Sequence, residues 1–209
     1  LPSAPVGVAN LQGRWNFDSE NANDSSGTGR HGIAKKLFSP SEVSSMKLWL
    51  DASSLSTAGS TWDDKSGNSN DAVKNGSPTI AIGTQNGKNI MRYSGTTGEF
   101  HSWAQMTDIR TVFWVLKKTG TNPNMLLLGD TTNYFFHPNG SNAMYHPSLG
   151  PVANVRSGTT KINGTSVNGT STGIPTSMSV VSLKTSGNVT ASNFANDRNI
   201  VQSGVNRVF

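Results

Sequence analysis

The chain has 209 residues, a net charge of +5 and no cysteine, and 93 of its residues are Ser, Thr, Asn or Gly. The missing cysteines exclude a disulfide framework, thiolate metal sites and thiol catalysis. Only 14% of the residues are charged and the basic ones form no block, so a nucleic-acid partner is not expected. The sequence has no run of about 18 apolar residues, so no membrane-spanning helix is predicted and no membrane insertion is expected.

The N-terminal part of the chain begins with a pattern that favours a strand. Leu11, Trp15 and Phe17 lie on odd positions, a partial period of two that is typical of a strand with one buried face. Residues 24–27, Asp-Ser-Ser-Gly, have turn chemistry, because Asp can cap its own turn and Gly accepts a positive φ.

A short helix is predicted to begin near Ser39. Ser39 can cap its first turn, Pro40 suits the first helical position, and Glu42 can close a capping box. Residues 47–51 already resemble a strand, so the helix must end early.

Short strands separated by turns are predicted along the rest of the chain. Asn-Gly pairs, which favour the tight turns of hairpins, separate several of them. Residues 111–116 form the strongest candidate; they are apolar on both faces and are predicted to lie in mid-sheet with both sides covered. The pattern predicts an all-β fold of two antiparallel sheets, a sandwich or jelly roll with at most one or two short helices. The predicted strands are 79–83, 89–94, 111–117, 125–129, 133–137, 143–146, 152–156, 160–163, 178–184 and 188–192.

The sequence offers little for glycoside hydrolysis. A retaining hydrolase needs two carboxylates about 5 Å apart, and sandwich hydrolases carry them as Glu-x-Asp-x-Glu on one strand. The chain has three glutamates, Glu20, Glu42 and Glu99, and none stands in that pattern. Only Glu20 has acidic neighbours, Asp18 and Asp24, in a segment that looks like a turn.

A polysaccharide lyase remains an alternative on residue types alone. Such an enzyme needs a base, often Tyr or His, and an Arg or Gln that neutralises the uronate. The lyase motifs of sandwich folds are absent, so we expect a protein without catalysis. The residues of suitable type are His101, His137, His146, Tyr93, Tyr134, Tyr145 and Arg92.

Oxygen ligands are densest in the segment that follows Trp62. Calcium takes six to eight oxygens, and Asp63, Asp64, Asn68 and Asp71 could supply several. Their spacing differs from that of a calcium loop ending in a bidentate Glu. A tight turn held by Asx hydrogen bonds is the alternative. No cofactor is required by either interpretation, and Ca²⁺ is the one candidate.

Sugar-binding sites pair an aromatic platform with polar side chains. Trp114 lies in the strongest predicted strand, and Trp15 and Trp49 also suit a core. Trp103 stands among polar residues and is a better candidate for exposure. The candidate ligand-binding residues are Trp103, Arg92, Tyr134, His137, Tyr145 and His146.

Several segments together resemble bacterial laminin-G-like domains of the concanavalin A-like superfamily. They are LWLDASSLSTAGSTWDDKSGNSNDA (48–72), NGKNIMRYSG (86–95), TVFWVLK (111–117) and SNFANDRN (192–199). The resemblance covers roughly residues 39–209, and residues 1–38 look like the truncated start of a similar domain. It implies a jelly roll that serves as a carbohydrate-binding or adhesion module in a larger exported protein. An extracellular or cell-surface location and a polysaccharide or cell-surface glycan partner are then expected.

The chain departs from this family at its end. Members usually continue past Arg207-Val208-Phe209 with a further strand, and without it an open row of backbone groups is expected beside residues 178–192. Such an edge invites pairing with another segment. We expect residues 1–36 or a strand of another chain to fill it. The alternative function is therefore a structural subunit of a surface filament or virion, a homo-oligomer assembling by strand or edge complementation.

Overall fold

The computed structural model describes residues 39–55, 57, 59–94, 98–120, 126–138 and 142–196. The chain divides into two compact units, Leu1–Ser44 and Ser45–Phe209. In the first unit the described residues contain the 3-10 helix η2 (Pro40–Glu42). The interpretation of residues 1–38 as the start of a similar domain lies outside the described residues.

The helix start predicted at Ser39 is a single 3-10 turn. Ser39 occupies the N-cap position, but its side chain caps no backbone N–H. Its hydroxyl instead lies 2.8 Å from the hydroxyl of Ser41. The turn is closed by the backbone, because the N–H of Glu42 donates to the carbonyl of Ser39 at 3.0 Å.

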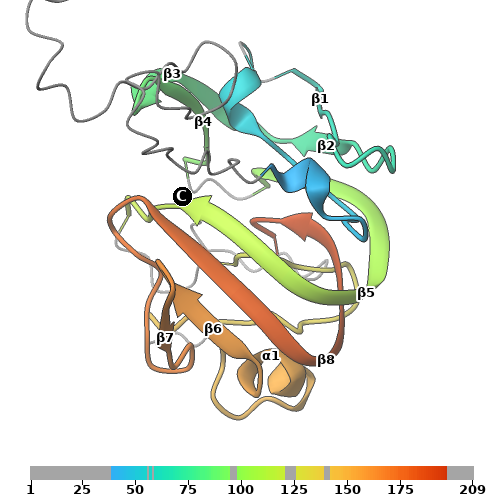
Figure 1. The fold of residues 1–209 in the computed structure, drawn as a ribbon, viewed down its shortest axis with the longest axis vertical. Coiled ribbons are helices and arrows are strands. Elements are labelled where there is room, and N and C mark those ends of the chain that lie inside the picture. The colour runs from blue at the N-terminus through green and yellow to red at the C-terminus, as the bar shows by residue number, and fades with distance from the viewer. Residues whose placement is uncertain are drawn as a thin grey trace, which may run out of the picture. The chain divides into compact units, whose positions relative to one another are not determined.

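The second unit is built on a six-stranded antiparallel sheet (Figure 1). Its strands lie in the order β1, β2, β5, β8, β6, β7, and β3 and β4 form a separate two-stranded sheet. The predicted all-β class, with two antiparallel sheets and few short helices, is confirmed. The strands are β1 (Thr61–Trp62), β2 (Ala72–Asn75), β3 (Thr79–Gln85), β4 (Lys88–Arg92), β5 (Phe100–Leu116), β6 (Thr159–Ile162), β7 (Thr165–Val167) and β8 (Ser179–Phe194).

β8 is an interior strand of this sheet. Its residues 181–184 pair with β5 on one side and with β6 on the other. Nearer its end, Gly129 donates its N–H to the carbonyl of Asn193 at 3.0 Å and accepts the N–H of Ser192 at 2.9 Å. Residues 181–184 and 192–193 of β8 therefore have backbone partners on both sides. The expected filling of an edge by residues 1–36 or by a strand of another chain lies outside the described residues and stays a prediction.

One face of β5 and β8 carries the hydrophobic core. Trp114 and Leu116 of β5 lie on this face with Val181 and Leu183 of β8, and none is more than 7% exposed. The buried cluster extends into irregular segments through Leu127, Leu128, Phe136, Met144 and Tyr145. The strands predicted at 125–129, 133–137 and 143–146 are wrong, since these positions contain at most isolated bridges. Most of the apolar residues that the structure describes in these segments are buried without joining a β-ladder.

The strand predicted at 152–156 is also wrong, because this segment is helical. It forms η4 (Gly150–Val152) and α1 (Ala153–Arg156). Val152 and Val155 are both fully buried, and a spacing of three residues places them on one side of a helix. Asn154 donates from Nδ2 to the carbonyl of Asn188 at 3.0 Å and so fastens the helix to β8.

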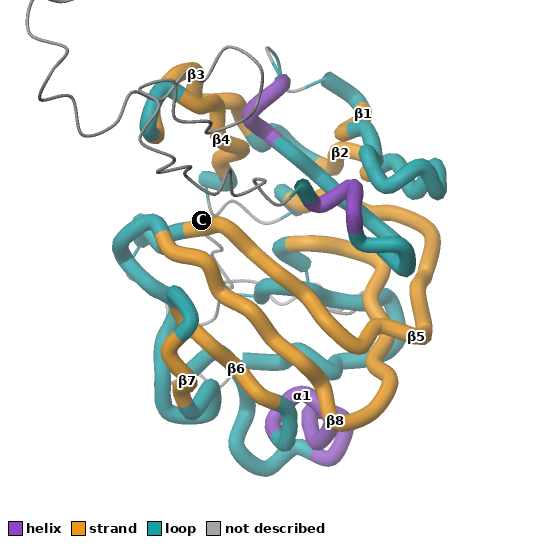
Figure 2. Tube along the Cα trace, in the orientation of Figure 1, coloured by secondary structure: helices purple, strands orange, loops and turns teal. Residues whose placement is uncertain are grey.

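β5 is longer than the strand predicted at 111–117. Its first half is not predicted from the sequence, because the pairing there is irregular. It pairs with β8 from His101 to Leu116, but the register shifts three times between Ser102 and Thr111. Such bulges bend a strand, and Figure 2 shows β5 curving along its length. The shifts interrupt the period of two, so residues 100–110 lack the alternation by which a strand is predicted.

A substitution at Gly129 tests how closely the irregular segment around this residue packs against β8. A Cβ at this position would lie 1.6 Å from the carbonyl oxygen of Asn196 and 2.6 Å from Oδ1 of Asn193. We expect Gly129→Ala to lower the free energy of unfolding in urea by about 3 kcal/mol, because backbone atoms must move to make room. Gly150→Ala is the matched control, since a Cβ there meets nothing within 4 Å. Equal stability of the two variants would contradict this packing.

Candidate functional sites

The segment predicted to bind calcium is a turn centred on Asp64. Its carboxylate accepts the N–H of Trp49 at 2.8 Å and of Asn70 at 3.1 Å. It also accepts the N–H and the hydroxyl of Ser66, at 2.9 and 2.7 Å. Burial alone would raise the pKa of Asp64, but these hydrogen bonds outweigh it and lower the pKa.

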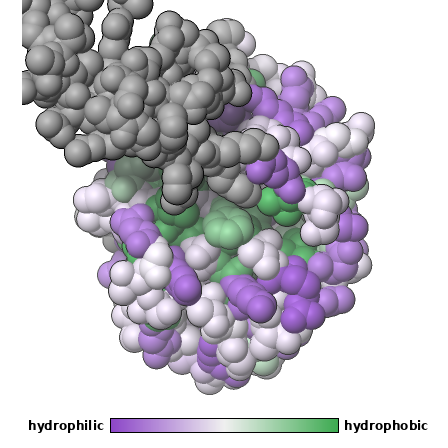
Figure 3. All heavy atoms as spheres, in the orientation of Figure 1, coloured by the Kyte–Doolittle hydropathy of each residue, from purple (hydrophilic) through white to green (hydrophobic). Residues whose placement is uncertain are grey.

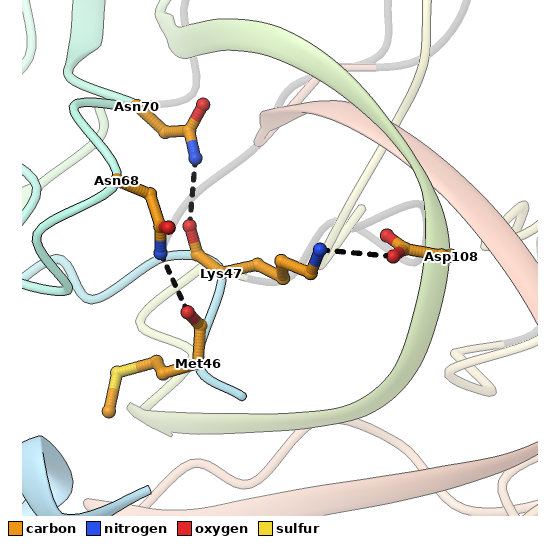
Figure 4. Close-up of polar contacts among 5 residues, drawn as sticks. All are labelled: Met46, Lys47, Asn68, Asn70 and Asp108. Atoms are coloured by element: carbon orange, nitrogen blue, oxygen red, sulfur yellow. Dashed lines mark hydrogen bonds and ion pairs between the residues drawn. The ribbon is translucent and has the colours of Figure 1, made fainter. Parts of the chain in front are cut away.

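The neighbouring polar side chains fasten this turn to the preceding segment (Figure 4). Asn68 donates from Nδ2 to the carbonyl of Met46 at 2.7 Å, and Asn70 donates to that of Lys47 at 2.9 Å. Lys47 continues the connection to β5 through an ion pair with Asp108, 3.2 Å from Nζ to Oδ2. The turn thus holds residues 46–50 in place.

The carboxylates of this turn are engaged in hydrogen bonds with the backbone, and calcium binding stays a prediction. Oδ1 of Asp71 accepts a hydrogen bond from the N–H of Asp64 at 2.8 Å. Both carboxylate oxygens of Asp64 already accept hydrogen bonds. Asp63 is exposed. In the described part of the chain, no group of three or more His, Asp or Glu side chains could hold a metal ion. The alternative of a tight Asx turn accounts for the geometry.

Asp64 and Asp63 form a matched pair for testing the turn. We expect Asp64→Ala to lower the free energy of unfolding by about 2 kcal/mol, because four donors lose their charged acceptor. Asp63→Ala should change it by less than about 0.5 kcal/mol. Urea unfolding with and without CaCl₂ measures both effects. Calcium that stabilises the parent chain and fails to stabilise Asp64→Ala would contradict the Asx turn and indicate a calcium site.

Two predicted sugar-binding residues are buried in the structure. Trp103 is 9% exposed and Tyr145 is 1% exposed, so neither offers an aromatic platform to a ligand. Trp103 shares the inner face of β5 with His101, two positions earlier. The Tyr145 ring is closely packed, since a Cβ on Gly169 would lie 2.5 Å from it.

Three other predicted residues come together in one partly exposed cluster. The ring centroids of Tyr134 and His137 are 6.2 Å apart, edge to face, and those of His137 and His146 are also 6.2 Å apart. The backbone holds the cluster, because the N–H of His146 donates to the carbonyl of His137 at 2.8 Å. Arg92 lies elsewhere, exposed on β4 opposite Thr79. We call Tyr134, His137 and His146 the Tyr-His cluster.

His101, one of the residues of lyase type, is a buried structural histidine. It is 1% exposed, and its Nδ1 lies 2.7 Å from the hydroxyl of Tyr93. Burial, with the positive charge of Lys74, lowers the pKa of His101 from 6.5 to about 4. Burial and the charge of Glu99 raise the pKa of Tyr93, so its hydroxyl keeps its proton and shares one hydrogen bond with Nδ1 of the neutral ring. The Trp62 ring packs edge-on against His101 at 5.4 Å.

The buried imidazole makes stability depend on pH. Between pH 6.5 and 4 the unfolded state binds a proton at His101 that the folded state excludes, so the free energy of unfolding falls as the pH falls through this window. The loss attributable to His101 approaches about 3 kcal/mol. Unfolding curves of the parent chain and of His101→Gln measure it by difference. A parent profile that parallels the variant's from pH 6.5 to 4 would refute a neutral buried His101.

Asp130 forms a second carboxylate-centred turn, which the sequence analysis missed. It is 1% exposed and accepts hydrogen bonds from Gln105 Nε2 at 2.9 Å and from the N–H of Asn133 at 3.0 Å. Thr132 donates its hydroxyl at 3.0 Å. Burial would raise the pKa of Asp130, but these donors hold it well below its usual range. The Asp-Thr-Thr-Asn order is the one signal that could have identified the turn.

In the described part of the chain, the outer face of the main sheet exposes several apolar side chains, contrary to the prediction that both faces of 111–116 are buried. Phe113 is 70% exposed, Val115 72% and Val180 44%. Val115 lies opposite Val180 in the pairing of β5 with β8, and alternate residues of a strand point to the same side. Figure 3 shows apolar side chains grouped over β5 and β8 with hydrophilic ones around them. Alternation alone could not reveal whether a second layer covers this side.

Comparisons of the chain with family models, curated proteins and solved structures return no match. The laminin-G-like resemblance accordingly stays a prediction based on the quoted segments. Among the residues that the structure describes, no helix is long and apolar enough to cross a bilayer.

Proposed function

We propose that this protein is a non-catalytic carbohydrate-binding or adhesion module that acts outside the cell. The observation that carries the proposal is the Tyr-His cluster. Tyr134 and His137 are three residues apart and His146 follows nine residues later, and the three side chains meet at a partly exposed site. Aromatic faces that stack on sugar rings, next to nitrogen and oxygen atoms that bond hydroxyls, are the usual composition of a sugar-binding surface.

The carboxylates of the described residues support binding over hydrolysis. A glycosidase acid needs a raised pKa so that it stays protonated near neutral pH. Hydrogen bonds hold the pKa values of Asp64 and Asp130 below their usual range. Glu99 is buried, and its Oε2 accepts both the N–H and the hydroxyl of Ser94. These groups serve the fold, and the proposal requires no cofactor.

The cluster is tested by glycan binding. The full chain is screened against a polysaccharide array, and the best ligand is titrated calorimetrically. We expect Tyr134→Ala and His137→Ala to weaken binding about tenfold each, because each removes one ring of the contact surface. His146 is less suitable for substitution, since its Nδ1 accepts the N–H groups of Ser148 and Leu149 and orders the loop.

Two controls make this experiment decisive. Arg92→Ala changes an exposed residue on β4 and should leave the affinity unchanged if the cluster alone forms the site. Circular dichroism confirms that each variant is folded. A ligand whose affinity is the same for the parent chain and both cluster variants, or an array without a ligand, would reject the proposal. Reducing-sugar release, or an unsaturated product that absorbs in the ultraviolet, would show an enzyme.

A further inference from the structure

The outer face of the main sheet presents apolar side chains next to lysines. We name Phe113, Val115, Val180, Lys161 and Lys184 the open sheet face. Phe113 lies opposite Ser182 of β8, which lies opposite Lys161 of β6, and Lys184 lies opposite Thr111. Paired residues of adjacent strands share a side of the sheet, so all five side chains belong to one surface.

The apolar part of this face is suited to contact with a protein. Phe113 and Val115 are among the most exposed large apolar residues of the described chain, and neighbouring exposed apolar side chains mark interaction sites. Sheet faces of this kind are normally covered by another layer of secondary structure. The two valines offer only methyl groups, which cannot bond sugar hydroxyls. These features favour a polypeptide over a glycan on this face.

The positive charge of the residues around β6 and β8 indicates which kind of protein partner would fit the open sheet face. The sequence contains no Asp or Glu from residue 131 to residue 196, whereas Arg156, Lys161 and Lys184 lie within it. Lys161 and Lys184 are exposed. Both charged members of the open sheet face are lysines, so a second copy packed face to face would bring like charges together, which is unfavourable. A partner that carries carboxylates beside its apolar side chains complements both features.

We propose that the open sheet face is a docking surface for an acidic, apolar segment of another protein. Its apolar side chains cover Phe113, Val115 and Val180, and its carboxylates lie next to Lys161 and Lys184. This surface is independent of the Tyr-His cluster, so either proposal can fail without the other.

The test uses a synthetic octapeptide of alternating glutamate and valine, labelled with fluorescein, and the full chain. Fluorescence anisotropy should show saturable binding that weakens as salt is added. We expect Phe113→Ser to weaken binding at least tenfold, and the double variant Lys161→Glu, Lys184→Glu to weaken it likewise. A peptide with lysine in place of glutamate should bind at least tenfold more weakly.

Matched controls lie on the small sheet. Ile82 of β3 is 68% exposed, close to the value for Phe113, and Lys88 of β4 is exposed. Ile82→Ser and Lys88→Glu should leave peptide binding unchanged. Because Phe113 is largely exposed, its substitution should not impair folding, which circular dichroism checks.

Four results would overturn the proposal. They are an absence of peptide binding up to about 1 mM, binding that Phe113→Ser leaves intact, and two outcomes that assign the face to another occupant. An oligogalacturonate that binds with the same dependence on Phe113 would assign the face to an acidic glycan. A concentration-dependent dimer in sedimentation velocity that Phe113→Ser abolishes would assign it to a second copy of this chain.

Discussion

The pairing of β5 with β8 runs from His101 opposite Phe194 to Leu116 opposite Ser179, and the other parts of the main sheet depend on it. β2 is paired to the first half of β5, and β6 is paired to the first half of β8. Because the register fixes which side chains face inward, it sets the two surfaces of the sheet together. A slip of β8 by one residue would expose Val181 and Leu183 and bury Lys184.

A chain with few apolar residues and no disulfide stabilises its connections through carboxylates. Asp64 and Asp130 follow the same plan, since each accepts hydrogen bonds from a hydroxyl residue two positions later and from an asparagine further on. Hydrogen bonds to a charged acceptor are stronger than neutral ones. The abundance of Ser, Thr and Asn therefore serves the turns and does not by itself indicate a binding surface.

The sequence was a good guide where a local pattern determines the structure. The hairpin of β3 and β4 was predicted because Asn86-Gly87 favours a tight turn, and both residues have a positive φ. The second half of β5 was predicted from its apolar run. The pattern failed at Val152 and Val155, whose burial follows from a helical spacing, and in the first half of β5, where bulges interrupt the alternation.

The candidate sites were harder to predict because exposure depends on layers that meet only in the fold. Trp103 has polar neighbours in the sequence, yet it shares the inner face of β5 with His101. Tyr145 and His146 are adjacent, and one is buried against Gly169 while the other joins the Tyr-His cluster. Asp63 and Asp64 differ in the same way. In each case the backbone direction decided which side chain is accessible, and residue type alone does not indicate it.

The two accessible surfaces differ in what they can recognise. The Tyr-His cluster combines ring faces with nitrogen and oxygen atoms, a combination that suits a ligand rich in hydroxyl groups. The open sheet face combines methyl groups and a phenyl ring with lysines, a combination that suits a ligand with both apolar and acidic groups. Beneath them lie buried polar groups that hydrogen-bond to one another, among them the Tyr93–His101 pair and Asp130 with Gln105. These hydrogen bonds fix the backbone beneath the two surfaces, and the proposal of recognition rests on the chemistry of the exposed side chains.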